Sequence, residues 1–340
     1  MAESVLVTGG AGFIGSHVAD KLIKQGFNVT IVDNMTGGYP ENVPLAATWY
    51  VADCEDVRYM KTIFEKAKPD YVFHLAAYAA EGLSHFIRRF NYANNLMASI
   101  NVITLAVHYK VKHLVFTGSM STYGDQSPPF TEDMPYKPTD PYAISKQAVE
   151  QDIKCAHEMW GIPYTIFRPH NVYGKRQNIW DFYRNVIGIF IYQALHDLPL
   201  TIFGDGSQIR AFSHIDDIVT PIVDSISNKN FLNETFNIGG DTPYTILQLA
   251  ETIREVAKEI DDKAVSFDFQ PPRVEVHEAY SNHDKLRKFY TYQSNICLKE
   301  GIREMYLWAK TQPNRPLFTW PKSSIEILDK IPPKWEKALK

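Results

Sequence analysis

Cysteine is scarce in this sequence, and so are the features of secreted and membrane proteins. The three cysteines, Cys54, Cys155 and Cys297, lie far apart and match no metal-ligand or Cys-x-x-Cys spacing. We therefore expect reduced thiols and no bound metal. No apolar run reaches the ~18 residues of a membrane span, and the first predicted strand begins too close to Met1 to leave room for a signal peptide. These absences favour a cytoplasmic protein.

Positive and negative residues are nearly balanced in number. The chain has 35 Lys and Arg against 39 Asp and Glu, a formal net charge of −4. Such a balance lacks the basic surplus that attracts nucleic acid or an anionic membrane, so we expect neither as a partner. With 340 residues, of which 45% are hydrophobic, the chain can form one large unit or two domains with a sizeable core.

The most informative stretch is a short apolar strand, a glycine-rich turn and an amphipathic helix, at 5–26. Glycines at positions 9, 10, 12 and 15 satisfy the Gly-x-Gly-x-x-Gly pattern, which lets the backbone approach a pyrophosphate at a helix N-terminus. Asp33 follows Gly15 by 18 residues, where a carboxylate accepts hydrogen bonds from the adenosine ribose. No Arg or Lys lies between Asp33 and Glu41, which favours NAD over NADP. A purely structural turn is the alternative.

Apolar runs and helical patterns alternate after this stretch, as expected for an open parallel sheet. Strands are predicted at 28–32, 49–51, 71–77 and 162–168, and a further strand begins at 113. Helices are predicted at 57–66, 91–109, 186–196, 248–260 and 298–310, and a further helix begins at 140. Segment 171–183 is predicted to be a loop. Segments 210–215 and 265–269 are predicted to be strands.

Several polar or small residues follow the strand ends and have two interpretations each. Asp53 is a candidate adenine contact or a solvated surface carboxylate. Ala76 and Ala77 leave room for a cofactor or simply pack. Asn94 either braces the nicotinamide side or merely lies near a helix start.

A tyrosine and a lysine four residues apart, Tyr142 and Lys146, share one helical face. Tyrosine titrates near pH 10 and is a poor base at neutrality, but a nearby cation favours the phenolate. Lys146 supplies one such charge and an oxidised nicotinamide another. Ser119 or Ser121 is placed to carry a proton between a substrate hydroxyl and that phenolate. The spacing alone also arises by chance.

Together these motifs resemble the extended short-chain dehydrogenase/reductase family, and within it nucleotide-sugar epimerases of the UDP-glucose 4-epimerase type. The match covers nearly all of positions 4–310 and includes segments 8–15, 74–77, 141–146, 168–174, 202–206, 214–217 and 236–239. It implies an α/β fold: a Rossmann-type doubly wound parallel sheet with a smaller C-terminal substrate-binding domain. Residues 1–168 and 213–237 would hold NAD, residues 169–212 and 238–320 the nucleotide sugar, and 321–340 would form a tail of unknown role.

The resemblance implies roles for individual residues. Ser119, Tyr142 and Lys146 would have catalytic roles. NAD contacts are implied for Gly9, Gly12, Phe13, Ile14, Gly15, Asp33, Asn34, Met35, Asp53, Cys54, Leu75, Ala76, Ala77, Asn94, Thr117, Tyr142, Lys146 and Pro169. Sugar-nucleotide contacts are implied for Ser119, Ser121, Tyr142, Asn171, Asn185, Phe203, Arg210 and Arg273, to which we add Glu81, in a segment that departs from the family pattern. Either arginine would otherwise be a surface residue in an ion pair.

The implied reaction is inversion at C4 of a UDP-sugar through a 4-keto intermediate. Sugar 4,6-dehydratases carry Thr-Asp-Glu at positions 119–121 and UDP-glucuronate decarboxylases a Glu at 121, whereas this chain has Ser-Met-Ser. The missing carboxylates favour epimerisation. A dehydratase or other keto-sugar enzyme is the alternative, because Glu81 brings a carboxylate of its own, and a non-catalytic NAD-binding sensor is a remote one.

Two further expectations follow from the resemblance. The small side chain of Ala279 predicts tolerance of UDP-N-acetylhexosamines beside UDP-glucose and UDP-galactose. Enzymes of this type form homodimers through the helices at 91–108 and 142–160, so a homodimer is expected.

Overall fold

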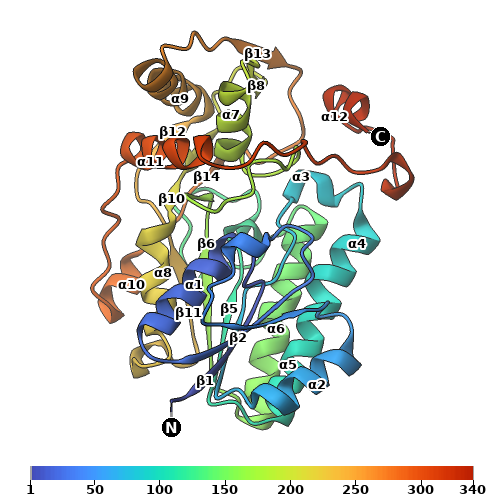
Figure 1. Cartoon of the computed structure of the whole chain (residues 1–340), viewed down its shortest axis with the longest axis vertical. Coiled ribbons are helices and arrows are strands. Elements are labelled where there is room, and N and C mark those ends of the chain that lie inside the picture. Colours follow the sequence, from blue (N-terminus) through green and yellow to red (C-terminus); the bar gives the residue numbers. More distant parts are fainter. Residues whose placement is uncertain (1, 340) are drawn as a thin grey trace.

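The computed structural model describes residues 2–339, and its centre is one seven-stranded parallel sheet (Figure 1). The strands lie in the order β11 (Glu234–Ile238), β6 (Tyr164–Pro169), β5 (His113–Thr117), β4 (Tyr71–His74), β1 (Ser4–Thr8), β2 (Asn28–Asp33) and β3 (Thr48–Val51). This arrangement is the doubly wound, Rossmann-type sheet that the sequence predicts.

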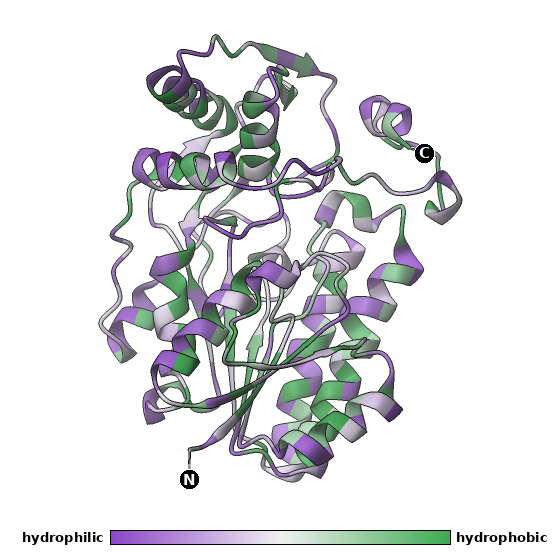
Figure 2. Ribbon diagram, viewed as in Figure 1, coloured by the Kyte–Doolittle hydropathy of each residue, from purple (hydrophilic) through white to green (hydrophobic). Residues whose placement is uncertain are grey.

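Helices cover both faces of the sheet. On one face lie α1 (Phe13–Lys24) and α8 (Ile215–Asp224), and on the other α2 (Val57–Ala67), α5 (Ala98–His108) and α6 (Pro141–Trp160). Side chains of a strand alternate between faces, so Leu6 joins the core under α5 while Val5 and Val7 join the core under α1. In Figure 2 the strands are mainly hydrophobic, as expected for strands buried on both sides.

A smaller layer lies beyond the carboxyl ends of the strands (Figure 1). Its core is formed by α7 (Val186–Leu195), α9 (Ile246–Asp261) and α11 (Leu298–Lys310) together with the parallel pair β8 (Leu200–Phe203) and β13 (Phe267–Gln270). A three-stranded sheet places β9 (Ile209–Ala211) between β12 (Pro243–Thr245) and β14 (Glu278–Ala279). Thr245 and Gln248 form a capping box that starts α9.

Two local expectations were wrong. The loop expected at 171–183 contains β7 (Val172–Tyr173), which pairs with β10 (Ser213–His214). The single helix expected at 91–109 is divided into α4 (Arg88–Tyr92), a π-helical turn (Ala93–Met97) and α5. The Asn95 amide explains the interruption, because it accepts from the Tyr78 N–H at 2.8 Å and donates to the Tyr78 carbonyl at 3.1 Å.

The remaining elements are short. They are α3 (Glu81–Ser84), α10 (Asp284–Phe289), α12 (Pro333–Ala338) and 3-10 turns at Pro40–Asn42, Met120–Tyr123, Lys229–Phe231 and Lys322–Ser324. After α11 the C-terminal segment (311–339) crosses the molecule to α12 on the opposite side (Figure 1). None of the helices between residues 2 and 339 is both long and apolar enough to span a membrane.

Candidate active site

One cleft of about 610 Å³ lies where the strand ends meet the smaller layer. Its lining includes every residue for which the sequence predicts a site role, with the exception of Met35. Residues that are far apart in the chain, such as Gly9, Glu81, Tyr142, Arg210 and Arg273, therefore share one cavity.

The glycine turn at one end of the cleft is too tight for side chains. A Cβ on Gly15 would lie 2.1 Å from the Gly9 carbonyl oxygen, and one on Gly9, whose φ is +72°, would lie 2.8 Å from the Ala76 backbone. Gly12 precedes α1 without any side-chain cap, so the first N–H groups of that helix stay available to an anion. This backbone fits the pyrophosphate of a dinucleotide.

Asp33 lies at the end of β2 beside this turn. Its carboxylate accepts from the Ala11 N–H at 3.0 Å and the Met35 N–H at 2.8 Å, while burial raises its pKa. Met35 thus orients Asp33 through its backbone instead of lining the cleft. Asn34 donates to Asp53 at 2.9 Å, which links the two predicted adenosine residues. The donor and acceptor set fits an NAD ribose.

The middle of the cleft is lined by small and neutral groups. Leu75, Ala76 and Ala77 follow β4, Thr117 ends β5, and Pro169 ends β6, while Asn94 projects from the π-helical turn. The interruption of the helix thus places a polar side chain next to the strand ends.

The hydroxyl groups near Tyr142 form a short chain of hydrogen bonds. Ser119 Oγ accepts from the Ser121 hydroxyl at 2.8 Å and from the Ser121 N–H at 3.1 Å, which leaves the Ser119 proton free to be donated. Lys146 is buried, donates to the Thr117 carbonyl at 2.7 Å, and lies 5.9 Å from the centre of the Tyr142 ring. Ser119, Tyr142 and Lys146 therefore all line the same part of the cleft as Thr117 and Ser121.

The pKa of Tyr142 differs from the sequence-based expectation. Burial raises it, the charge of Glu81 raises it further, and the hydroxyl of Ser119 opposes both. Burial also lowers the pKa of Lys146 to about 7. Burial thus disfavours both the Tyr142 phenolate and the Lys146 ammonium, and a further positive charge beside the phenol would favour the phenolate.

Arg210 and Arg273 converge at the other end of the cleft. Both contact Glu275, with N–O distances of 3.6 Å and 3.1 Å, and the Arg273 guanidinium lies 4.7 Å from the centre of the Phe203 ring. Arg210 also donates from Nη1 to the Ile209 and His277 carbonyls, both at 2.8 Å. Arg273 is therefore the guanidinium with more donors open to a diphosphate.

Asn171 and Asn185 extend this end of the cleft. Both are exposed to it and adopt the left-handed backbone region, with φ of 41° and 66°. Asn185 precedes α7, and its neighbour Arg184, which the sequence analysis missed, donates to Asp181 at 2.8 Å and lies 4.4 Å from the Tyr78 ring centre. Adjacency to Asn185 was the one available signal for Arg184.

Glu81 lies at the start of α3, with its side chain open to the cleft but enclosed by protein beyond it. Burial, and after it the charge of Asp140, raises its pKa to about 7. Asp140, also missed from sequence, caps α6 by accepting from the Ala143 N–H at 2.8 Å, and His85 lines the cleft nearby.

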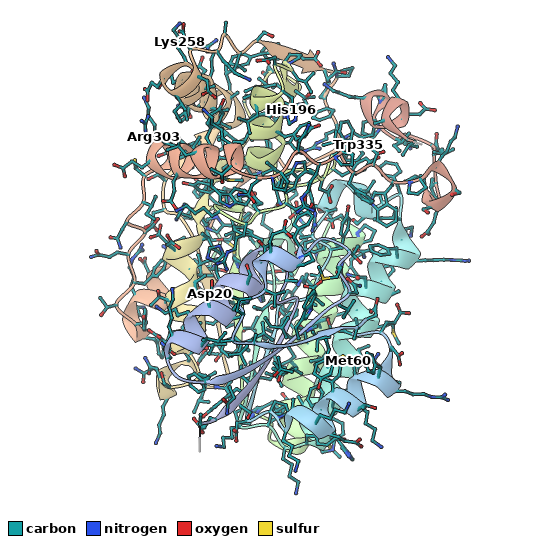
Figure 3. The ribbon with its side chains drawn as sticks, in the orientation of Figure 1. Asp20, Met60, His196, Lys258, Arg303 and Trp335 are labelled. Carbon is teal, nitrogen blue, oxygen red and sulfur yellow. The ribbon has the colours of Figure 1, made fainter. Side chains whose placement is uncertain are left out.

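The C-terminal segment packs behind the residues that line this end of the cleft. Trp335, labelled in Figure 3, comes from α12, is 4% exposed, and packs against Tyr183 with ring centres 5.4 Å apart. A Cβ on Gly82, next to Glu81, would lie 3.2 Å from the Trp335 ring. Trp320 donates to the Tyr78 hydroxyl at 3.0 Å. The tail thus packs behind the cleft, a position that no sequence pattern predicted.

The chain is similar to known proteins along most of its length. The pattern of the NAD dependent epimerase/dehydratase family matches residues 5–239. The crystal structure of UDP-glucose 4-epimerase with UDP-glucose from Thermotoga maritima is 33% identical, with a TM-score of 0.82, over 90% of this chain and 98% of that one. That of the Thermus thermophilus UDP-glucose 4-epimerase complex with NAD is 28% identical, with a TM-score of 0.84, over 90% and 99%.

A third similar protein carries a different substrate in its name. The UDP-glucuronate 4-epimerase of Thermodesulfobacterium geofontis is 30% identical over 90% of this chain and 95% of its own. The predicted resemblance, the Rossmann-type fold and the cofactor NAD are confirmed, since this family is NAD-dependent. The chain belongs to the NAD dependent epimerase/dehydratase family.

Proposed function

We propose that this protein is a UDP-sugar 4-epimerase that interconverts UDP-glucose and UDP-galactose. The observation that carries the proposal is the group of Ser119, Tyr142 and Lys146 in one part of the cleft, with Met120 and Ser121 beside it. A proton acceptor for a sugar hydroxyl is present there, but positions 120 and 121 supply neither the acid nor the base for a following elimination.

Binding is divided between the two ends of the cleft. The glycine turn, Asp33 and Asn34 hold NAD, while Arg210, Arg273 and Asn185 hold the UDP group. We assign the first task to residues 1–168 and 213–237 and the second to 169–212 and 238–320. Ala279, 8% exposed in the cleft wall, leaves space for a 2-acetamido group, so UDP-N-acetylhexosamines are further candidate substrates.

Proton management falls to the chain's own residues. The Tyr142 phenolate takes the proton of the sugar O4 through or beside Ser119. Lys146 is held in place by its hydrogen bond to the Thr117 carbonyl. NAD, when bound, supplies the hydride acceptor and donor. The arginine pair keeps the diphosphate in place while the 4-keto sugar turns. Tyr142 returns its proton to O4 when C4 is reduced on its opposite face, so that C4 is inverted.

The test is a direct assay. Purified protein is incubated with UDP-glucose, and the nucleotide sugars are separated by chromatography. We expect the same final mixture of UDP-glucose and UDP-galactose whether the reaction starts from UDP-glucose or from UDP-galactose, without added NAD. Unchanged sugar from both sides would overturn the proposal.

A second candidate function rests on Glu81. With a pKa of about 7, this carboxyl group is partly protonated at neutral pH and is suited to protonate a leaving hydroxyl. A 4,6-dehydration would then give a 4-keto-6-deoxy sugar, in which water is lost across C5 and C6 and the hydride returns to C6. The same assay distinguishes the two reactions, because this product differs in mass from UDP-glucose and UDP-galactose by one water.

A further inference from the structure

Two loops from different parts of the fold meet across the cleft. The first, here called the cofactor loop, comprises residues 36–42 after β2, and its first three residues line the cleft. The second, here called the facing loop, comprises residues 178–184 before α7 and contributes Arg184 to the lining. The two loops touch, because a Cβ on Gly37 would lie 2.3 Å from the Arg184 guanidinium. The cleft is therefore bridged at this point.

On one side, the cofactor loop is bonded to the glycine turn. Tyr39 donates its N–H to the Ala11 carbonyl at 3.0 Å, and the Asn42 amide donates to the same oxygen at 3.1 Å. A Cβ on Gly38 would lie 2.7 Å from the Ala11 backbone. The cofactor loop thus lies directly against the turn whose backbone fits the pyrophosphate of NAD, so the position of the loop determines how firmly NAD is enclosed.

On the other side, the cofactor loop is joined to the facing loop through the Tyr39 side chain. The Tyr39 hydroxyl donates to the Asn178 side chain at 2.9 Å. The Tyr39 ring meets the Trp180 ring edge to face, with ring centres 5.4 Å apart, which is a favourable geometry for two aromatic rings. Trp180 is 4% exposed and belongs to the core of the smaller layer, so this contact connects the cofactor loop to a fixed part of the fold.

The C-terminal segment adds a second connection between the two loops. The Arg315 guanidinium lies 4.2 Å from the centre of the Tyr39 ring and 5.2 Å from that of the Trp180 ring. The same guanidinium forms an ion pair with Glu41 of the cofactor loop. Phe318 keeps the segment in this place, since its N–H donates to the Trp180 carbonyl at 2.7 Å. One side chain of the tail thus contacts both loops at once.

We propose that Arg315 is a positioning residue that retains NAD in the cleft by holding the cofactor loop against the facing loop. Neither Arg315 nor Tyr39 lines the cleft, so both act on NAD only through the position of the cofactor loop. The family resemblance ends near residue 310 and assigns Arg315 no role. In both candidate reactions the hydride returns to the sugar, so NAD can stay bound from one turnover to the next. A loop that is held closed suits this chemistry.

The experiment follows the exchange of bound NAD for an excess of the fluorescent analogue etheno-NAD in the purified full-length protein, without any sugar. Arg315→Ala should exchange about tenfold faster than the wild type, because the lost contacts act mainly on the rate of dissociation. Arg303→Ala is the matched control and should exchange at the wild-type rate. Arg303, labelled in Figure 3, lies on α11, is 51% exposed and pairs with Glu259 at 3.2 Å.

A double-mutant cycle separates this role from a general loss of structure. Tyr39→Ala should also accelerate exchange, and the double variant should be at most about twofold faster than the quicker single variant, since both side chains act through one contact. Single effects that multiply in the double variant would overturn the proposal, as would a wild-type rate in Arg315→Ala or a wild type that loses its NAD during purification. Conversion of UDP-glucose is assayed separately with excess NAD, so failure of the epimerase proposal leaves the exchange result standing.

Discussion

The two ends of the cleft are built from different materials. At the cofactor end, backbone and small residues make the contact surface, and an added Cβ at Gly9 or Gly15 would meet other backbone atoms within 3 Å. At the sugar end, the contact surface is made by charged side chains from separate segments, among them Glu81, Arg210 and Arg273. Backbone shape depends on the whole fold, whereas a side chain can change with little effect on it. The sugar end is therefore where this chain can set a chemistry of its own.

The largest effect is expected from Tyr142→Phe, which removes the reacting group at the meeting point of the two ends. Turnover should fall by ~10³-fold or more, because no other described group replaces the phenol beside Ser119. NAD should stay bound, since the glycine turn is unchanged. Turnover and the NAD released on denaturation are measured side by side, with Tyr59→Phe on the exposed face of α2 as control. Activity within tenfold of the wild type would contradict the role of Tyr142.

Gly15→Ala tests the cofactor end of the cleft. The new Cβ would lie 2.1 Å from the Gly9 carbonyl oxygen, so the turn must shift, at a cost of about 1–3 kcal/mol in the free energy of unfolding. The purified variant should contain little NAD and unfold at lower urea concentration. Gly188→Ala on α7 is the control, because its Cβ would have its nearest heavy atom at 3.5 Å. Full NAD content in Gly15→Ala would show that the cofactor end tolerates change as the sugar end does.

Trp335→Ala asks whether the tail belongs functionally to the sugar end. Trp335 lies against Gly82 and Tyr183, and the Arg273 guanidinium lies 5.8 Å from the centre of its ring. Its loss should raise KM for the UDP-sugar about tenfold, or ~1.4 kcal/mol of binding, with kcat and NAD content unchanged. Trp160→Ala, 64% exposed at the end of α6, should alter neither. A fall in kcat and NAD content together would instead mean a general loss of structure.

The same contrast explains what the sequence could predict. The glycine turn, Asp33 and the Tyr142–Lys146 pair are short-range patterns, and each specifies its local geometry. Arg184 belongs to no such pattern, and Trp335 reaches the residues behind the cleft only through tertiary packing. Asp140 is local, because it caps α6 two residues before Tyr142, but a cap gives no sign of a role in the site. The π-helical turn was also invisible, because the apolar spacing around it suits an uninterrupted helix and the cause is a contact of Asn95 with the distant Tyr78.

The smallest effect is expected from Glu81→Gln on stability, and it should change with pH. Burial, followed by the charge of Asp140, raises the pKa of Glu81 from 4.5 to about 7, so the folded protein favours the protonated form. This contribution to stability is fully present below pH 4.5 and is lost as the pH rises through about 7. Glutamine cannot ionise and avoids that loss.

The melting temperature of Glu81→Gln relative to the wild type should therefore be higher at pH 8 than at pH 4.5. Because the side chain is open to solvent in the cleft, screening reduces the difference to about 1 kcal/mol, or about 1–2 °C. Scanning calorimetry at both pH values measures it, with Glu251→Gln on α9, where the side chain is 47% exposed, as the control. A pH-independent difference would mean that Glu81 ionises as it does in water. The sugar end would then lack the raised carboxyl pKa that Glu81 contributes to it.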